Sequence, residues 1–237
     1  MTTERWADEH KLIEALSRII GRCDEWQVDL LLIGAFAVRA YAERRRLTTD
    51  LDFVTTCSSQ HHLAALFESL GYEYKAHTRF GGVQAVKYLD EQGTKIQVDI
   101  AIDAIRDQNS GNVYRIPDDA FRQKIGVEIV STGDRPGVRA YVLPLSDLLI
   151  TKLIVSRDQD AVDVINIVLG NLPSAVVADF KRKVAKARLA TEINARLGEM
   201  VNLPPRTIQG LMRDYTGGHL TDNDIRRLKR ALRQLRI

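Results

Sequence analysis

Cysteines and long apolar segments are scarce in this sequence. Only Cys23 and Cys57 occur among its 237 residues, too few for a zinc site or a disulfide scaffold, and in a reducing compartment they are most simply two buried thiols. The longest apolar run, residues 30–38, has 9 residues, whereas a membrane-spanning helix needs ~20. The N-terminal residues are charged and lack the apolar core of a secretory signal, so we expect a cytoplasmic protein that does not contact membranes.

What the sequence has instead is a globular composition with an uneven distribution of charge. Hydrophobic residues make up 45% and charged residues 27% of the chain. Residues 1–174 carry 20 basic and 25 acidic side chains, whereas residues 175–237 carry 14 basic and 6 acidic ones. A Gly-Asn-Leu-Pro cluster at residues 170–173 lies near this change in charge. We therefore expect one domain over residues 1–170 and a basic helical region over residues 171–237.

The hydrophobic spacing predicts an α+β fold, in which a small mixed sheet is flanked by helices and followed by a helical C-terminal part. Apolar or alternating runs predict strands over residues 28–33, 50–55, 72–77, 83–89 and 95–103, and edge strands over 127–130 and 139–142. A turn cluster at residues 90–93 predicts a hairpin. Helices are expected to end near Gly21 and Gly71, to span 36–43 and 146–170, and to continue beyond 173 with a break at Pro204-Pro205.

The strongest chemical signal is Thr48-Thr49-Asp50-Leu51-Asp52-Phe53. Side chains two residues apart on a strand share a face, so Asp50 and Asp52 point to one side while Leu51 and Phe53 point to the core. A third acid, Asp99, interrupts a later apolar strand in the same manner. If the two strands are neighbours, three carboxylates converge. Asp103 is the alternative third acid if the register differs.

Converging carboxylates need a cation between them. At about 4 Å, two unit negative charges repel by ~4 kcal/mol at the effective dielectric of a partly buried site. An all-oxygen site suits Mg²⁺ or Mn²⁺ better than zinc. Asp-x-Asp also occurs at strand ends and turns that hold no metal. Gly34-Ala35 lies at a strand-to-helix turn, where backbone amides can bind phosphate, although such a dipeptide is also typical of any tight turn.

Together these residues resemble a known family. Gly34-Ala35, then Arg46-x-Thr48-x-Asp50-Leu51-Asp52, then Asp99 resemble the DNA polymerase β-like nucleotidyltransferase superfamily. The run over residues 143–167, with Lys152 followed by Arg157-x-x-Asp160-x-x-Asp163, is similar to the AbiEii/MenT-type toxin nucleotidyltransferases. The resemblance covers roughly residues 28–170 and implies that residues 1–170 form the catalytic domain. Ala35 departs from the usual Gly or Ser, which removes any hydroxyl contact with phosphate.

The resemblance also implies a reaction and a set of roles. A nucleoside monophosphate would pass from an NTP such as ATP to an acceptor hydroxyl, with release of pyrophosphate. Asp50 and Asp52 would hold two Mg²⁺ or Mn²⁺ ions, and Asp99 would complete the acceptor-side ion. The catalytic set would be these three acids and Lys152. The nucleotide would be bound by Gly34, Ala35, Arg46, Thr48 and Asp160.

Three of these residues also have plainer interpretations. Arg46 belongs to an Arg44-Arg45-Arg46 run that is equally typical of a solvated loop. Lys152 lies in an apolar stretch and can extend its amine to the surface without any ligand. Asp160, near a helix N-terminus, can simply favour the helix dipole.

The basic C-terminal region bears on which molecule accepts the nucleotide. In the last helix, Arg226, Arg227, Lys229, Arg230, Arg233 and Arg236 flank an apolar stripe. These cations either form an ordinary solvated face or contact phosphates. By analogy with the family, RNA such as tRNA is the favoured acceptor, and an antitoxin protein is an expected partner. The alternatives are a small hydroxylated acceptor, as in antibiotic nucleotidyltransferases, or a non-catalytic protein that binds nucleotides or nucleic acid.

Overall fold

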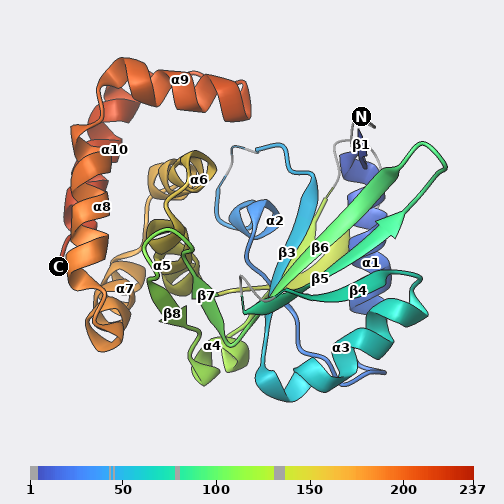
Figure 1. The fold of residues 1–237 in the computed structure, drawn as a ribbon. Helices are drawn as coiled ribbons and strands as arrows, with labels where there is room; N and C mark the ends of the chain where they lie inside the picture. The colour runs from blue at the N-terminus through green and yellow to red at the C-terminus, as the bar shows by residue number, and fades with distance from the viewer. Residues whose placement is uncertain (1–4, 43, 45, 78–80, 131–136) are drawn as a thin grey trace. The chain divides into compact units, whose positions relative to one another are not determined.

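The computed structural model describes residues 5–42, 44, 46–77, 81–130 and 137–237. The chain divides into two compact units (Figure 1). The first unit consists of Met1–Ala40, Thr48–Ile105 and Ile116–Leu143, and the second of Tyr41–Leu47, Arg106–Arg115 and Pro144–Ile237. Each unit is described by itself below.

The first unit is built on a mixed sheet of eight strands, which confirms the predicted α+β class. Its strands run in the order β4-β5-β6-β3-β2-β10-β9, with β1 alongside β6. β3 runs parallel to β6, and β10 parallel to β2, while β5 pairs with β6 as the predicted antiparallel hairpin. The strand bounds are β1 Arg5–Trp6, β2 Leu31–Leu32, β3 Asp50–Thr55, β4 Glu73–His77, β5 Gly82–Tyr88, β6 Thr94–Ile102, β9 Ile125–Ile129 and β10 Val138–Val142.

The long helix near the N-terminus covers one face of this sheet, and the candidate acids lie on the other. The first unit contains α1 (Glu9–Cys23), α2 (Ala35–Val38), α3 (Cys57–Ser69) and α4 (Asp118–Arg122). The buried residues of α1, among them Leu12 and Leu16, pack toward β3, β6 and β10. Ile96 of β6 lines a hollow together with Ala15 of α1, so the even-numbered residues of β6 face the helix. Asp99 and Gln97 therefore face the opposite side of the sheet.

The second unit is mainly helical. Its helices are α5 (Leu145–Val155), α6 (Asp158–Leu169), α7 (Ser174–Ala187), α8 (Ala190–Asn202), α9 (Pro205–Thr216) and α10 (Asp222–Leu235). α10 packs against α6, α7, α8 and α9, and α5 packs against α6, α7 and α8. Because α5 and α6 group with the C-terminal helices, the compact units divide at Leu143, and a domain boundary at residue 170 stays a prediction.

The structure also corrects several local predictions. The single helix expected over residues 146–170 is two helices in the structure. α5 ends before Ser156, whose φ of 54° is left-handed, and α6 begins after Arg157. The strand predicted at 139–142 is not an edge strand, because β10 lies between β2 and β9. Cys23 is buried as expected, but Cys57 is exposed because it opens α3 on the solvent side.

The structure contains two short strands that the sequence did not predict, β7 (Ala104–Arg106) and β8 (Val113–Arg115). Among the described residues, no helix combines the length and the apolar character needed to cross a bilayer.

Candidate active site

The register of β3 and β6 brings the three sequence-predicted acids together. Asp52 pairs with Asp99, and Asp50 pairs with Gln97, in the parallel ladder between these strands. Paired residues on neighbouring strands share a face, as do residues two apart, so all three carboxylates point the same way. One carboxylate oxygen from each of Asp50, Asp52 and Asp99 lies within 4.8 Å of the other two. We call these residues the carboxylate cluster.

Asp99 is held by two glutamines that the sequence analysis did not identify. Gln84 Nε2 donates to Asp99 Oδ1 at 2.9 Å, and Gln97 Nε2 donates to Asp99 Oδ2 at 2.7 Å. Gln97 lies two residues before Asp99 on β6, and Gln84 lies opposite Asp99 on β5. Extending the register of the predicted hairpin from its turn would have found Gln84, so the signal was present in the sequence.

Asp50 has a neutral partner of its own. Thr48 Oγ1 donates to Asp50 Oδ1 at 2.8 Å, and Thr48 is buried. The hydroxyl therefore contacts a member of the carboxylate cluster; a direct role of Thr48 in nucleotide binding stays a prediction. Among the described residues, neither Asp50 nor Asp99 forms a salt bridge.

The composition and spacing of the cluster fit a divalent cation. All three ligands are carboxylates, which are the donors that Mg²⁺ and Mn²⁺ prefer. Thr48, which donates to Asp50, and Gln84 and Gln97, which donate to Asp99, are neutral, so these hydrogen bonds do not offset the negative charge of the two acids. The residues present thus match what a magnesium or manganese site requires.

Gly34 makes room for Asp52. It precedes α2 at the turn after β2, and a Cβ added to it would lie 2.0 Å from Asp52 Oδ2 and 2.8 Å from Asp52 Cγ. No side chain can occupy that space while the Asp52 carboxylate stays in place. The sequence suggested that Gly34 lies in a phosphate-binding turn, and the structure adds a steric reason for a glycine at this position. Phosphate binding by the amides of Gly34 and Ala35 stays a prediction.

We expect Gly34→Ala to displace the Asp52 carboxylate and so to weaken Mn²⁺ binding by at least ~10-fold, the loss usual when a metal ligand loses its support. The thermal unfolding temperature should also fall, because overpacking costs ~1–3 kcal/mol. Isothermal titration with Mn²⁺ and thermal unfolding measure the two effects. Gly21→Ala is the control, since nothing lies within 4 Å of its added Cβ. Wild-type Mn²⁺ affinity in Gly34→Ala would contradict the steric argument.

The remaining sequence-predicted residues form a separate ion-pair cluster inside the second unit. Lys152 Nζ lies 3.2 Å from Asp160 Oδ1 and 2.8 Å from Asp163 Oδ2. Arg46 donates to both oxygens of Asp163, from Nε at 3.1 Å and from Nη2 at 3.3 Å. Arg157 Nε donates to Asp160 Oδ2 at 2.8 Å. Arg46 is therefore an ion-pair partner within this unit and not a solvated loop residue.

Burial sets the electrostatics of this second cluster. The side chains of Lys152, Asp160 and Asp163 are 6%, 1% and 0% exposed. Burial by itself raises the pKa of Asp160, but the charge of Lys152 and the hydrogen bond from Arg157 outweigh it and hold that pKa below the ordinary value. Asp163 forms ion pairs with both Arg46 and Lys152, so Lys152 lies between two buried acids. Nucleotide binding by Arg46 and Asp160 and the catalytic role of Lys152 stay predictions.

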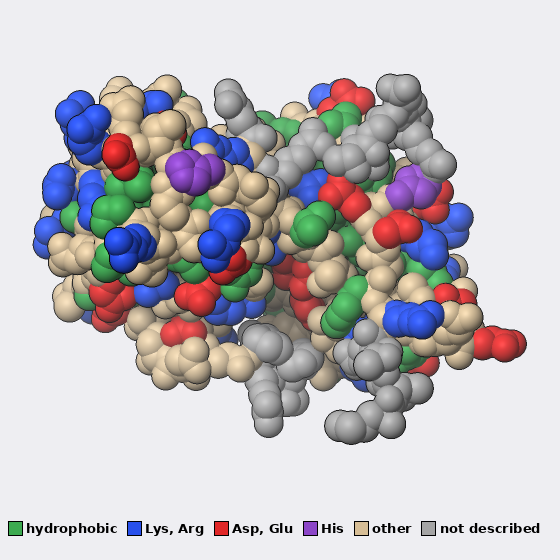
Figure 2. Space-filling view, turned by 90° about the horizontal axis from the view of Figure 1, so that it is seen from above, with side chains coloured by type: hydrophobic (Ala, Val, Ile, Leu, Met, Phe, Trp, Pro, Cys, Tyr) green, Lys and Arg blue, Asp and Glu red, His purple; other side chains and the backbone are tan. Residues whose placement is uncertain are grey.

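Exposed cations gather on the helical unit (Figure 2). On α10, Ile225, Leu228 and Leu232 are buried, while Arg226, Arg230 and Arg233 are exposed at positions that share one helix face. These three arginines are called the α10 arginine stripe.

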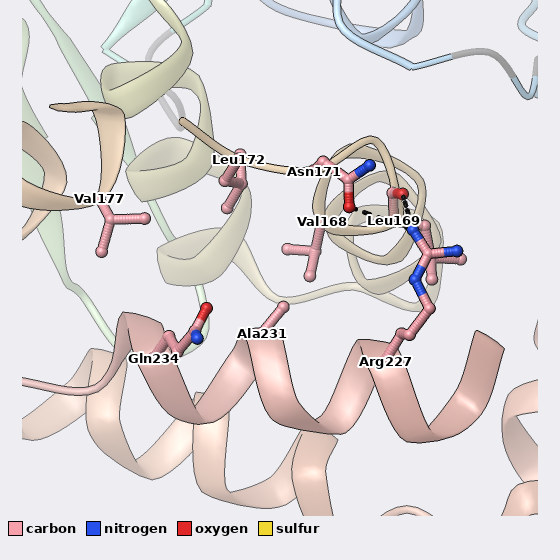
Figure 3. Close-up of a pocket in the computed structure, with 8 residues that line it drawn as sticks. All are labelled: Val168, Leu169, Asn171, Leu172, Val177, Arg227, Ala231 and Gln234. Carbon is pink, nitrogen blue, oxygen red and sulfur yellow. Dashed lines mark hydrogen bonds between the residues drawn. The ribbon is translucent and has the colours of Figure 1, made fainter. Parts of the chain in front are cut away.

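The other α10 cations have structural partners. Lys229 Nζ donates to the Leu203 carbonyl at 3.0 Å. Arg227 donates to Asn171 Oδ1 at 3.1 Å and to the Leu169 carbonyl at the end of α6, beside a hollow of about 140 Å³ (Figure 3). These two residues therefore join helices of the unit.

Comparison with known proteins identifies no family for this chain. No family model and no curated protein matches it. Among solved structures, the antibiotic-resistance factor ANT(2'')-Ia is 15% identical, covering 79% of this chain and 90% of its own, with a TM-score of 0.41. An antigenic nucleotidyltransferase-like protein from Paracoccidioides brasiliensis is 16% identical, covering 80% and 95%, with a TM-score of 0.44. The lincomycin-bound lincosamide antibiotic adenylyltransferase LnuA is 16% identical, covering 69% and 98%, with a TM-score of 0.42.

Proposed function

We propose that this chain is a metal-dependent nucleotidyltransferase, which moves a nucleoside monophosphate from an NTP to an acceptor hydroxyl. The observation that carries the proposal is the approach of Asp50, Asp52 and Asp99 oxygens to within 4.8 Å on one face of β3 and β6. Carboxylates at this separation favour divalent cations between them. For Asp50 and Asp99, the hydrogen-bond donors Thr48, Gln84 and Gln97 are neutral, so these contacts do not offset the charge of either acid.

The chemistry follows from the ligand set. Asp50, Asp52 and Asp99 would hold Mg²⁺ or Mn²⁺, and the bound ions would polarise the reacting phosphoryl group and offset charge on the departing pyrophosphate. The acceptor oxygen bonds to the α-phosphorus as the bond to the bridging oxygen breaks, and that electron pair leaves with pyrophosphate. The acceptor hydroxyl releases its proton to solvent. Thr48 donates a hydrogen bond to Asp50, and Gln84 and Gln97 donate hydrogen bonds to Asp99, all without adding charge to the site.

RNA is the acceptor that the described surface favours. The α10 arginine stripe presents three exposed guanidinium groups, which suit a row of phosphates. The toxin-like activity and the antitoxin partner implied by the resemblance stay predictions.

The proposal is tested by incubating the full chain with each labelled NTP, Mg²⁺ or Mn²⁺, and total RNA that includes tRNA. Label transferred to RNA, with release of pyrophosphate and loss of activity in EDTA, is the expected result. Parallel reactions contain an aminoglycoside or a lincosamide instead of RNA. Label on these molecules would support nucleotidyl transfer and overturn RNA as the acceptor. Label on no acceptor would contradict the enzymatic proposal and favour a non-catalytic binding protein.

A further inference from the structure

We infer that Gln84 and Gln97 are positioning residues, which together fix the orientation of Asp99 for metal binding. The inference rests on the proposed function and concerns the same site. It assigns a role to two polar side chains that lie on the face of the sheet carrying the acids and that bind Asp99 from two different strands.

Two hydrogen bonds restrain the orientation of the Asp99 carboxylate. A carboxylate at the end of a short side chain can rotate about its Cβ–Cγ bond. A single hydrogen bond restrains one oxygen, whereas donors at Oδ1 and Oδ2 fix the plane of the whole group. Gln84 and Gln97 supply these two donors at 2.9 and 2.7 Å, both within the normal range for N–H···O bonds. Asp99 is thus held at both oxygens.

Asp99 can still bind a metal ion after it has accepted both hydrogen bonds. An ionised carboxylate offers about four lone-pair positions, two on each oxygen. The two amides use one position on each oxygen, so each oxygen of Asp99 can still accept a cation. A lysine or arginine in place of either glutamine would instead neutralise Asp99 and compete with a metal ion. Neutral donors orient the acid and preserve its charge, as expected for residues that support a metal ligand.

The third step concerns where the glutamines lie. In the cross-strand rows of the sheet, Gln84, Asp99 and Asp52 form one row, and Val86, Gln97 and Asp50 form the next. The glutamines are therefore the immediate neighbours of the acids across β5, β6 and β3. Both side chains are half-buried, so they do not contribute to the apolar core on the α1 side of the sheet.

The experiment compares wild type with Gln84→Met, Gln97→Met and the double variant. Methionine keeps the volume of glutamine and removes the N–H donors. Mn²⁺ affinity is measured without nucleotide by electron paramagnetic resonance, and thermal unfolding is measured with and without Mn²⁺. Gln60→Met is the matched control, because Gln60 is exposed on α3 and its hydrogen bond is with Cys57.

We expect wild type and Gln60→Met to bind Mn²⁺ equally, and the double variant to bind at least ~10-fold more weakly. Without metal, the variants should unfold near the unfolding temperature of wild type. Added Mn²⁺ should raise the unfolding temperature of the variants less than it raises that of wild type. With an identified acceptor, the Mg²⁺ concentration for half-maximal transfer should rise, and kcat at saturating Mg²⁺ should change less. If one single variant does not fold, the other tests the inference, since each glutamine lies on its own strand.

The outcomes separate the inference from the proposed function. Wild-type Mn²⁺ affinity in the double variant, or tighter binding, would overturn the positioning role and leave the metal site intact. Weaker Mn²⁺ binding together with a clear drop in the unfolding temperature of the metal-free double variant would also overturn the positioning role. In that case the glutamines would stabilise the fold and not orient Asp99. Absence of Mn²⁺ binding by wild type would overturn the metal site and the inference together.

Discussion

Asp52→Asn is expected to reduce nucleotidyl transfer by about 10³-fold, the scale on which loss of one preorganised electrostatic group lowers a rate. Asp52 lies between the other two acids in the sheet, beside Asp50 on β3 and opposite Asp99 on β6. Asparagine keeps the shape of the side chain, but it removes the negative charge and replaces one carboxylate oxygen with an amide nitrogen, which does not bind Mg²⁺. The measurement is the transfer rate with the acceptor that the labelling experiment identifies.

The same substitution is expected to leave the metal-free fold intact or to stabilise it. Removing one of three neighbouring negative charges relieves repulsion of up to ~4 kcal/mol per pair at 4 Å. The unfolding temperature without metal should therefore equal or exceed that of wild type, while stabilisation by Mn²⁺ is lost. Lost activity with retained stability distinguishes a catalytic acid from a structural one.

Asp103→Asn is the matched control for this prediction. Asp103 follows the end of β6 and accepts a hydrogen bond from the Cys57 amide at 2.8 Å through Oδ1. Asparagine can accept the same bond, so transfer should stay within a factor of two of wild type, a change of less than ~0.5 kcal/mol. Wild-type turnover in Asp52→Asn, or an equal loss in Asp103→Asn, would refute the assignment of the carboxylate cluster.

The sequence predicted the strands of the site well because their pattern is strict. Residues 50–53 alternate acidic and apolar side chains, and the predicted strand over residues 50–55 has the bounds of β3 in the structure. The hairpin of β5 and β6 follows from turn chemistry at residues 90–93. What local pattern could not settle is the pairing of β3 with β6, because these strands are far apart in the sequence. That pairing determines whether Asp99 meets Asp52.

Other features depended on contacts that no short segment encodes. The collision of a Cβ at Gly34 with Asp52 arises from the packing of the turn after β2 onto β3. Likewise, the apolar run around Lys152 suggested a lysine that extends to the surface, but the sequence did not indicate which acids face it. The fold supplies Asp160 and Asp163 from the next helix, and the lysine is buried.

Lys152→Met is expected to destabilise the protein by about 3 kcal/mol, the lower end of the cost of removing one partner of a buried ion pair. The substitution leaves Asp160 and Asp163 buried without the ammonium group that lies between them. Arg157 and Arg46 still contact these acids, which keeps the cost from being larger. For a chain of this length, the unfolding temperature should fall by about 6–12 °C.

Acidification provides an independent check of this ion pair. The folded-state pKa of Asp160 is depressed, so its interactions stabilise the fold above the unfolded pKa, and that contribution is lost as the pH falls through the folded value. Without Lys152 the depression is smaller. The difference in stability between wild type and Lys152→Met should therefore be largest near neutral pH and should narrow below about pH 4, the ordinary pKa of aspartate.

The double variant Lys152→Met/Asp160→Asn separates the electrostatic cost from a packing cost. Neutralising Asp160 removes one of the two buried charges that Lys152 no longer offsets, so the double variant should unfold at a higher temperature than Lys152→Met alone. An equal or lower unfolding temperature would contradict the ion-pair argument. Because the family resemblance also places Lys152 in the catalytic set, transfer by Lys152→Met has to be measured well below its unfolding temperature. Only activity lost by a folded variant indicates that the ammonium group acts on the nucleotide as well as on the two acids.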